Sequence, residues 1–270
     1  MSTEEYTIQG GREGKRRLDL LGTITDHHTA RFLDDLGVPQ GISALDVGCG
    51  GGNVTLQIAR RVGPSGRVVG IDFDVEVLEC ARDDAKAAGL DNVEFRTGDA
   101  RAPDGGPYDL VAARFVLCHL AGPERVLAAL VAALRPGGLL MIEDTDFTGM
   151  FTIPGHAITT QAVDVYRETL RRGAGDADIG QRLPLLLRAA GLESVSVAAV
   201  QPILEGEQRQ LMASTLRMMK PHVIGRGVLT ADAWQALVTE LSAFLDDPEV
   251  LVGCPRVIQA AGRVPLKPGK

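Results

Sequence analysis

The sequence predicts an α/β protein built on a doubly wound parallel sheet. A short, mostly apolar run at residues 44–47 leads into a glycine cluster at 48–52 and then a helix-like segment at 53–62. Apolar strand patterns and helical patterns go on alternating as far as residue 144. Parallel strands joined by helices hold their ligands at the carboxyl ends of the strands, so the glycine cluster marks the expected binding edge.

The other core elements follow in a regular order. We expect strands at 68–72, 93–97, 108–114 and 139–144, and helices at 53–62, 75–88 and 123–134. Gly89 ends the second of these helices, and a Pro-Gly-Gly sequence at 136–138 forms the turn into the fifth strand. Glycine and proline are typical of such helix ends and turns.

Gly48, Gly50 and Gly52 predict a loop on which a nucleotide-like ligand lies directly against the main chain. Three kinds of glycine loop are alternatives. The dinucleotide fingerprint needs a glycine where Asn53 stands, and the ATP-binding P-loop needs a Gly-Lys-Ser/Thr sequence that does not follow here. The remaining interpretation is the loop that holds the methionine half of S-adenosylmethionine (SAM).

Acidic residues at the ends of the next strands favour that interpretation. Asp72 ends the second strand, where a carboxylate can accept hydrogen bonds from both ribose hydroxyls, although it would also serve as a helix N-cap. Asp99 follows the third strand and would accept from the adenine amino group, next to the Ala100 backbone N–H, unless it is an ordinary turn residue. Asp46 would order the glycine loop or meet the methionine ammonium through water.

Five motifs occur in order along the chain: LDVGCGGG, GIDFD, GDA, YDLV and LRPGG. Through them the sequence resembles the class I SAM-dependent methyltransferases. A Tyr-x-x-x-Gly-Gly start at 6–11, the stretch ARFVLCHL at 113–120 and the stretch EDTDF at 143–147 are similar to bacterial small-molecule methyltransferases of the secondary-metabolite type. The chain is also similar, less closely, to the ubiquinone and menaquinone C-methyltransferases.

The resemblance implies a Rossmann-like fold of seven strands, mostly parallel, with the last strand antiparallel. It also implies SAM as the cofactor and S-adenosylhomocysteine (SAH) as its product. The residues expected to bind the cofactor are Tyr6, Gly11, Asp46, Gly48, Gly50, Gly52, Asp72, Phe73, Gly98, Asp99, Ala100 and Arg114. Tyr6 and Gly11 belong to a segment that would fold over the cofactor, and a disordered tail is the alternative.

The segments outside the core predict a cap and a lid. We expect an N-terminal helical cap at 1–40, with helices at 13–22 and 25–36, and a SAM-binding core at 41–270. Insertions near 148–177 and 203–252 are longer than a sheet connection requires, so we expect a helical lid over the acceptor chamber. Within and between them we expect a loop at 149–155, helices at 157–172, 179–190, 205–224 and 230–246, and strands at 194–200 and 256–263.

Charge and cysteine pattern argue against several classes of function. The net charge is −7 and no block of lysine and arginine occurs, so we expect no nucleic-acid partner. The arginines at 11–17 and 171–172 are expected on solvated helix faces. No apolar run could span a membrane, and the four cysteines form no C-x-x-C pair. We therefore expect a cytoplasmic protein without a membrane partner or a metal, since the acidic cluster at 143–146 is alone weak evidence for magnesium.

The expected reaction is methyl transfer by in-line displacement to a small, largely apolar metabolite. Methionines and leucines at 211–224 suit an adaptable apolar chamber. O-methylation is favoured; C-methylation of a polyketide, quinone or terpenoid carbon, and a non-catalytic SAM-binding protein, are the alternatives.

The candidate catalytic residues are His119, His156 and Arg114. His119 and His156 are the candidate bases, because an oxygen nucleophile must lose a proton, although a purely structural His119 is the competing interpretation. Arg114 would bind a carboxylate of SAM or of the acceptor, or pair with Asp144 or Asp146. Exchange of the cap between subunits would give a homodimer.

Overall fold

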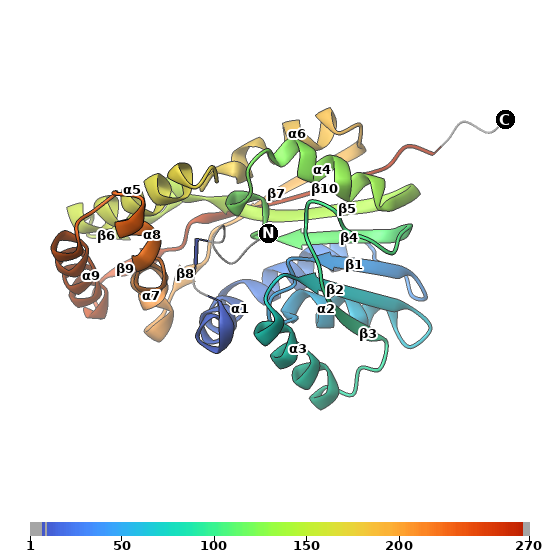
Figure 1. Cartoon of the computed structure of the whole chain (residues 1–270), viewed down its shortest axis with the longest axis horizontal. Coiled ribbons are helices and arrows are strands. Elements are labelled where there is room, and N and C mark those ends of the chain that lie inside the picture. Colours follow the sequence, from blue (N-terminus) through green and yellow to red (C-terminus); the bar gives the residue numbers. More distant parts are fainter. Residues whose placement is uncertain (1–6, 9, 267–270) are drawn as a thin grey trace.

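A computed structural model describes residues 7–8 and 10–266. Its main sheet has seven strands in the order β3-β2-β1-β4-β5-β10-β7 (Figure 1). The strands are β1 (Ser43–Val47), β2 (Arg67–Asp72), β3 (Val93–Thr97), β4 (Tyr108–Arg114), β5 (Leu134–Asp146), β7 (Glu193–Val200) and β10 (Arg256–Arg263). β10 lies antiparallel between β5 and β7, and the other pairs are parallel. The Rossmann-like fold with an antiparallel last strand is confirmed.

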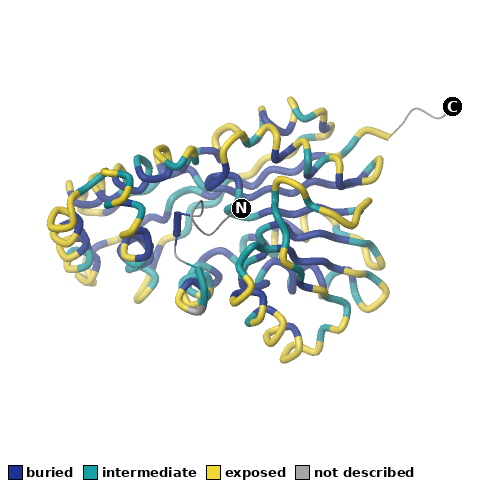
Figure 2. Tube along the Cα trace, viewed as in Figure 1, coloured by how far each residue is buried: buried dark blue, intermediate teal, exposed yellow. Residues whose placement is uncertain are grey.

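Helices cover both faces of this sheet. They are α1 (Gly11–Asp35), α2 (Asn53–Val62), α3 (Val75–Ala87), α4 (Pro123–Ala132) and α6 (Leu183–Ala189). Ala44 of β1 packs with α1 and α2, whereas the next residue, Leu45, packs with α4 and α6. Because successive side chains of a strand point to opposite faces, the central strands are buried on both sides, as Figure 2 shows.

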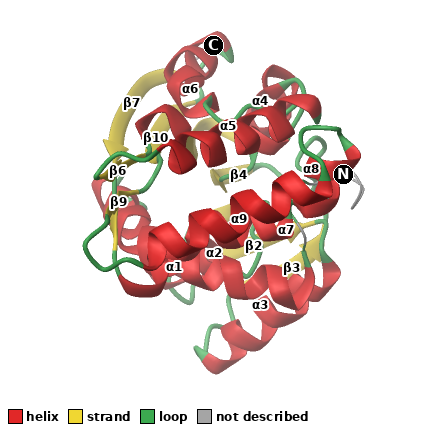
Figure 3. Ribbon diagram, turned by 90° about the vertical axis from the view of Figure 1, so that its left-hand side faces the viewer, coloured by secondary structure: helices red, strands yellow, loops and turns green. Residues whose placement is uncertain are grey.

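A second group of elements lies beyond the carboxyl ends of the strands, on the left of Figure 1. This lid layer consists of α5 (Ala157–Arg172), α7 (Leu211–Met218), α8 (Lys220–Gly225), α9 (Ala231–Asp246) and a small antiparallel sheet of β6 (Phe151–Ile153), β9 (Leu251–Gly253) and β8 (Ile203–Leu204). Seen from that side, α1, α7 and α9 lie in front of the main sheet (Figure 3).

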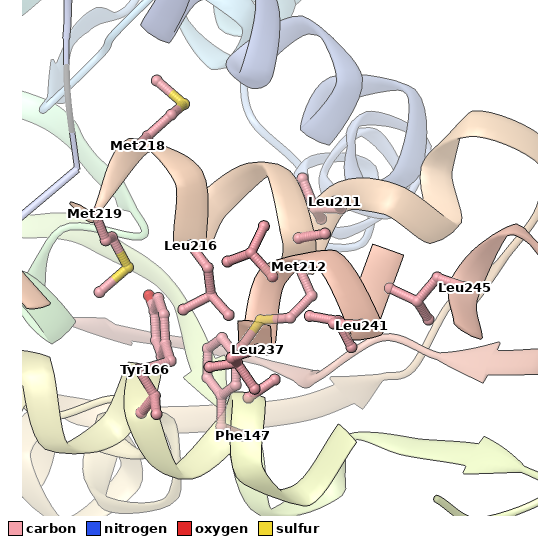
Figure 4. Packing of buried hydrophobic residues seen from close by; sticks show 14 of the residues in the cluster. Phe147, Tyr166, Leu211, Met212, Leu216, Met218, Met219, Leu237, Leu241 and Leu245 are labelled. Atoms are coloured by element: carbon pink, nitrogen blue, oxygen red, sulfur yellow. The ribbon is translucent and has the colours of Figure 1, made fainter. Parts of the chain in front are cut away.

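The lid layer has an apolar core of its own (Figure 4). Phe147, which follows β5, stacks on Tyr166 of α5 with ring centroids 4.2 Å apart. Leu216 of α7 and Leu241 of α9 are fully buried in the same cluster. Ile24 of α1 belongs to it as well, so the N-terminal helix holds the lid layer against the main sheet.

The expected pair of helices in the cap is wrong, because α1 runs unbroken from Gly11 to Asp35. Gly22, which we expected to end a helix, lies inside α1 at a close approach to α2. A Cβ there would lie 2.5 Å from Asn53 Nδ2. The glycine therefore permits close packing between two helices and does not end one.

The lid insertions also differ in detail from expectation. The loop expected at 149–155 contains β6, which pairs with β9. The helix expected at 205–224 is divided into a 3-10 turn, α7 and α8. Pro221 lies in the first turn of α8, where its missing N–H costs no hydrogen bond. Likewise, the helix expected at 179–190 begins as a 3-10 turn before α6. The 3-10 turns of the described chain are η1 (Leu117–His119), η2 (Phe147–Gly149), η3 (Ile179–Arg182) and η4 (Gly206–Gln210).

Within residues 7–8 and 10–266, no helix combines the length and apolar character needed to cross a membrane. The division into a cap at 1–40 and a core at 41–270 stays a prediction. Phe32 and Leu33 of α1 are buried in the core of the main sheet, and Ile24 is buried in the lid layer.

Candidate active site

A cavity opens at the carboxyl ends of β1, β2 and β4, between the sheet, α1 and α7. It has two sides. The loop side is lined by Asp46, Gly48, Cys49, Gly50, Gly51, Asp72, Phe73, Asp74, Gly98 and Ala100. The lid side is lined by Arg17, Leu21, Thr25, His119, Phe147, Met150, Leu211, Met212, Thr215 and Cys254. Arg114 lines the cavity as well. Residues from both ends of the chain thus meet at one edge of the sheet.

The glycine loop has the backbone that its sequence predicts. Gly48 and Gly50 have φ angles of +65° and +48°, in the left-handed region that favours glycine. A Cβ at Gly48 would lie 2.5 Å from Val116 Cγ2, and one at Gly50 would lie 2.9 Å from Leu18 Cδ1. Gly52, with φ of +84°, is the N-cap of α2 and lies outside the cavity lining. The loop therefore needs glycine at these positions for two reasons: its backbone is left-handed there, and the side chains packed against it leave no room for a Cβ.

Asp72 lies at the end of β2 and faces the cavity. Its carboxylate accepts hydrogen bonds from the backbone N–H groups of Gly50 (2.9 Å) and Asp74 (3.0 Å). Burial raises the pKa of this carboxyl, and the two backbone donors oppose that shift. An ionised carboxylate has about four acceptor positions, so Asp72 keeps acceptor capacity for a ligand. The N-cap of α3 is Asp74, so the helix-capping alternative for Asp72 is wrong.

The N-terminal end of α1 closes the loop side from outside. The Gly11 N–H donates to Asp74 Oδ2 (2.7 Å), and Lys15 pairs with Asp84 of α3 (3.1 Å). Gly10, directly before α1, lines the cavity, whereas Gly11 does not. Tyr6 lies outside the described residues.

Asp46 is buried beneath the glycine loop. Thr55 of α2 donates to its Oδ2 (2.6 Å), and burial raises the pKa of the Asp46 carboxyl to about 7. Through Thr55 this side chain links the end of β1 to the first turn of the next helix. That position is consistent with the expected role in ordering the loop.

Of the three cofactor-binding residues expected directly after β3, two lie at the cavity. Gly98 and Ala100 line it, and Asp99 does not. Asp99 accepts from the Arg101 backbone N–H (2.9 Å) and pairs with the Arg101 guanidinium (2.8 Å), which holds the pKa of the Asp99 carboxyl well below its usual range.

Arg114 ends β4 in a buried polar network. Its Nη1 lies 2.9 Å from Asp26 Oδ1 and donates to Thr29 Oγ1 (2.9 Å), both on α1. Thr29 Oγ1 in turn donates to Glu143 Oε2 (2.7 Å), and Gln259 Nε2 donates to Glu143 Oε1 (2.5 Å). The partners proposed from sequence, Asp144 and Asp146, are therefore wrong: Asp26 is the partner of Arg114.

The two candidate histidines lie in different surroundings. His119 is buried and lines the lid side; burial, and then the nearby Arg17 guanidinium, lower the pKa of its imidazole to about 3. His156 is exposed and lies outside the cavity lining. Its Nδ1 caps α5 by accepting from the Ile158 N–H (3.2 Å), and its ring stacks on Phe244. The structure does not bring the two rings to one reacting position.

Sequence reasoning singled out His119, Leu211 and Met212 of the lid side. It missed Arg17, Thr25 and Thr215. The expectation that the arginines at 11–17 lie on a solvated face is wrong for Arg17, which lines the cavity. Its apolar neighbours at helical spacing, Leu18 and Leu21, are the signal that this face of α1 is buried. No group of three or more acidic, histidine or cysteine side chains suited to a metal occurs among the described residues.

Comparison with known proteins agrees with this geometry. A sequence profile described as a methyltransferase domain matches residues 39–182, just over half of the chain. The chain belongs to this methyltransferase family. Its expected class and its SAM cofactor are confirmed at the level of the family.

Two curated relatives align with part of this chain. An uncharacterised protein of transposon Tn4556 from Streptomyces fradiae is 32% identical over 220 residues, covering 78% of this chain and 61% of that protein. The ubiquinone/menaquinone biosynthesis C-methyltransferase UbiE of Hahella chejuensis is 35% identical over 138 residues, covering 50% and 53%. The chain therefore spans about half to three-fifths of the length of these relatives.

A solved structure shares the fold. The YcgJ protein of Bacillus subtilis superposes with a TM-score of 0.60 at 14% identity, covering 88% of this chain and 99% of that one.

The residues present fit SAM. Gly48 and Gly50 line the cavity with main chain alone, and Asp72 presents a buried carboxylate with spare acceptor positions. A ribose diol needs such an acceptor, and an amino-acid moiety needs the polar backbone of the loop.

Proposed function

We propose that this methyltransferase-family chain transfers a methyl group from SAM to a small, largely apolar metabolite. The observation that carries the proposal is one cavity with two unlike sides. Its loop side holds carboxylates and bare backbone, and its lid side is mainly apolar. SAM, when bound, supplies a methyl group activated by its sulfonium sulfur, so the protein chiefly aligns the reactants and excludes water.

The proposal places the cofactor on the loop side. Asp72 accepts from the ribose hydroxyls, and the loop from Gly48 to Gly51 carries the methionine end. Asp46 orders that loop through Thr55. Gly98 and Ala100 line the adenine end, with Asp99 beside them. Arg114, held by Asp26 and Thr29, lines the same cavity.

The acceptor then occupies the lid side, where Phe147, Leu211 and Met212 offer an apolar surface. We favour O-methylation, with C-methylation as the alternative; the relative from Hahella is named as a C-methyltransferase. A lowered pKa makes His119 a weak base, and the pKa of the neighbouring Cys118 thiol is raised by burial. The acceptor atom is therefore one that is nucleophilic without a strong protein base.

Calorimetric titration with SAM and SAH tests the cofactor site. We expect micromolar binding of both by the wild type and loss of binding by Asp72→Ala. Asp109→Ala is the matched control, because Asp109 also accepts a backbone N–H at a strand end, from Ser43 (2.8 Å), but lies outside the cavity lining. Folded protein that binds neither ligand, or equal weakening by the two substitutions, would contradict the site.

Transfer of a labelled methyl group tests the activity. Incubation of wild type with labelled SAM and a panel of apolar phenols, enols and carboxylic acids should give at least one methylated product and stoichiometric SAH. SAM binding without any product across the panel would favour the non-catalytic alternative. A cytoplasmic location and a homodimer remain predictions, for which fractionation and light scattering are the measurements.

A further inference from the structure

We propose that Arg17 is the group that binds the acceptor, and that it recognises a negatively charged oxygen, a carboxylate or an enolate, on an otherwise apolar molecule. The proposal rests on the proposed function and names the substrate class of the same cavity. It starts from a cation on the lid side, where the surrounding surface is mostly apolar.

Arg17 is held in a fixed orientation by the lid layer. Its Nε donates to Thr215 Oγ1 (2.9 Å), and Thr215 is buried and donates in turn to the Leu211 carbonyl (2.7 Å). Because Nε is engaged, the guanidinium is anchored at one edge. Within the described part of the chain, Nη1 and Nη2 of Arg17 make no hydrogen bond. The edge of the guanidinium formed by these two nitrogens is therefore available to a ligand.

Arg17 differs from Lys15 and Arg114 in having no carboxylate partner among the described residues. Lys15 on the same helix pairs with Asp84, and Arg114 pairs with Asp26, but no carboxylate of the described chain lies within ion-pair distance of Arg17. The carboxylates among the described lining residues are Asp46, Asp72 and Asp74, all on the loop side. A guanidinium that is partly removed from water loses hydration, and a bound anion would offset that loss.

The chemistry of the fork selects the anion. Two neighbouring N–H donors in one plane match the two oxygens of a carboxylate or of a 1,3-dicarbonyl enolate, and an apolar surrounding strengthens such charge-assisted bonds. Arg17 is close enough to His119 to lower the pKa of its ring, so the anion would lie beside a neutral imidazole. An acceptor that is already ionised at neutral pH also needs no protein base. Such an acceptor is compatible with the low basicity of His119 on the same side of the cavity.

Calorimetry on the SAH-saturated protein tests the proposal with two matched probe pairs. Salicylate is compared with neutral salicylamide as the carboxylate arm, and dimedone with its neutral methyl enol ether as the enolate arm. We expect at least one anion to bind about tenfold or more tightly than its neutral partner, as a charge-assisted pair predicts. Which arm shows the preference identifies the acidic group.

Three variants make the result specific to Arg17. Arg17→Gln should abolish the preference for the anion, and Arg17→Lys should restore it only in part, because lysine keeps the charge without the fork. Arg16→Gln, an exposed neighbour on the same helix, should behave as wild type. Equal binding of anion and neutral partner by wild type, no binding of any probe, or a preference that survives in Arg17→Gln would overturn the proposal. The SAH titration of each variant is independent of it: failure there counts against the proposed function.

Discussion

Arg114 Nη1 and Asp26 Oδ1 lie 2.9 Å apart and join the end of β4 to the middle of α1. Their side chains are 10% and 32% exposed, so the pair is largely shielded from water. Asp26 also accepts from Asn53 Nδ2 (2.9 Å) at the start of α2. One carboxylate thus connects the N-terminal helix, the glycine-loop helix and the arginine of the cavity.

Removing this carboxylate should destabilise the fold measurably. Asp26→Ala leaves Arg114 partly buried without its counter-charge, so we expect the free energy of unfolding in urea to fall by about 1–3 kcal/mol. Asp35→Ala is the control, because the Arg31–Asp35 pair is exposed on the same helix and should contribute less than about 0.5 kcal/mol. Equal effects of the two substitutions would mean that the Arg114–Asp26 pair adds nothing.

The pKa of Asp46 predicts a particular dependence of stability on pH. Burial raises the pKa of this carboxyl from 3.8 to about 7, so between these values the folded chain binds a proton that the unfolded chain does not. Stability from this group is therefore lost as pH rises through about 7. Asp46→Asn, which stays neutral, should gain stability relative to wild type as pH rises from 5 to 8 in urea unfolding experiments.

Glu94 provides the control for that experiment. Arg96, and then Arg67, hold the pKa of the Glu94 carboxyl at about 2, well below that pH range. The difference between Glu94→Gln and wild type should therefore stay constant over the same range. A constant difference for Asp46→Asn as well would show that Asp46 ionises normally in the folded chain.

Gly48 allows the cost of a left-handed backbone to be separated from the cost of a steric clash. Gly37 has nearly the same φ, +63° against +65°, but nothing lies within 4 Å of a Cβ placed there. Gly37→Ala should lower the free energy of unfolding by about 1–2 kcal/mol. Gly48→Ala should lower it further, because its Cβ meets Val116, and should weaken SAM binding in calorimetry. Equal stability of the two variants would mean that the loop shifts freely.

His156 should matter for stability and not for chemistry. Since its ring caps α5 outside the cavity lining, His156→Ala should lower the free energy of unfolding by about 1 kcal/mol. The kcat and KM for methyl transfer should stay within about twofold of wild type. A much larger fall in kcat, with SAM binding intact, would place His156 at the reacting centre after all.

Local sequence patterns were sufficient for the individual strands of the core and for the loop side. The left-handed glycines and the strand-end Asp72 are set by residues within a few positions of one another, and their backbone preferences survive in the fold. The same holds for α2 and α3, whose bounds lie within a residue of expectation. Seven strands with an antiparallel last one followed from the resemblance, since strand order is not encoded in any single segment.

Only the tertiary structure decided which distant residues meet. Arg17 and Thr215 are 198 positions apart, and Asp26 and Arg114 pair across α1 and β4. The spacing of Leu18 and Leu21 indicates which face of α1 is buried, but only the packing of α7 against that face decides that Arg17 meets Thr215 at a cavity. In the same way, the close packing at Gly22 requires α2, and the short strand β6 forms only because β9 pairs with it. Residue type and spacing therefore determined the individual strands of the core and the glycine loop, whereas contacts between segments far apart in sequence determined the lid side of the cavity.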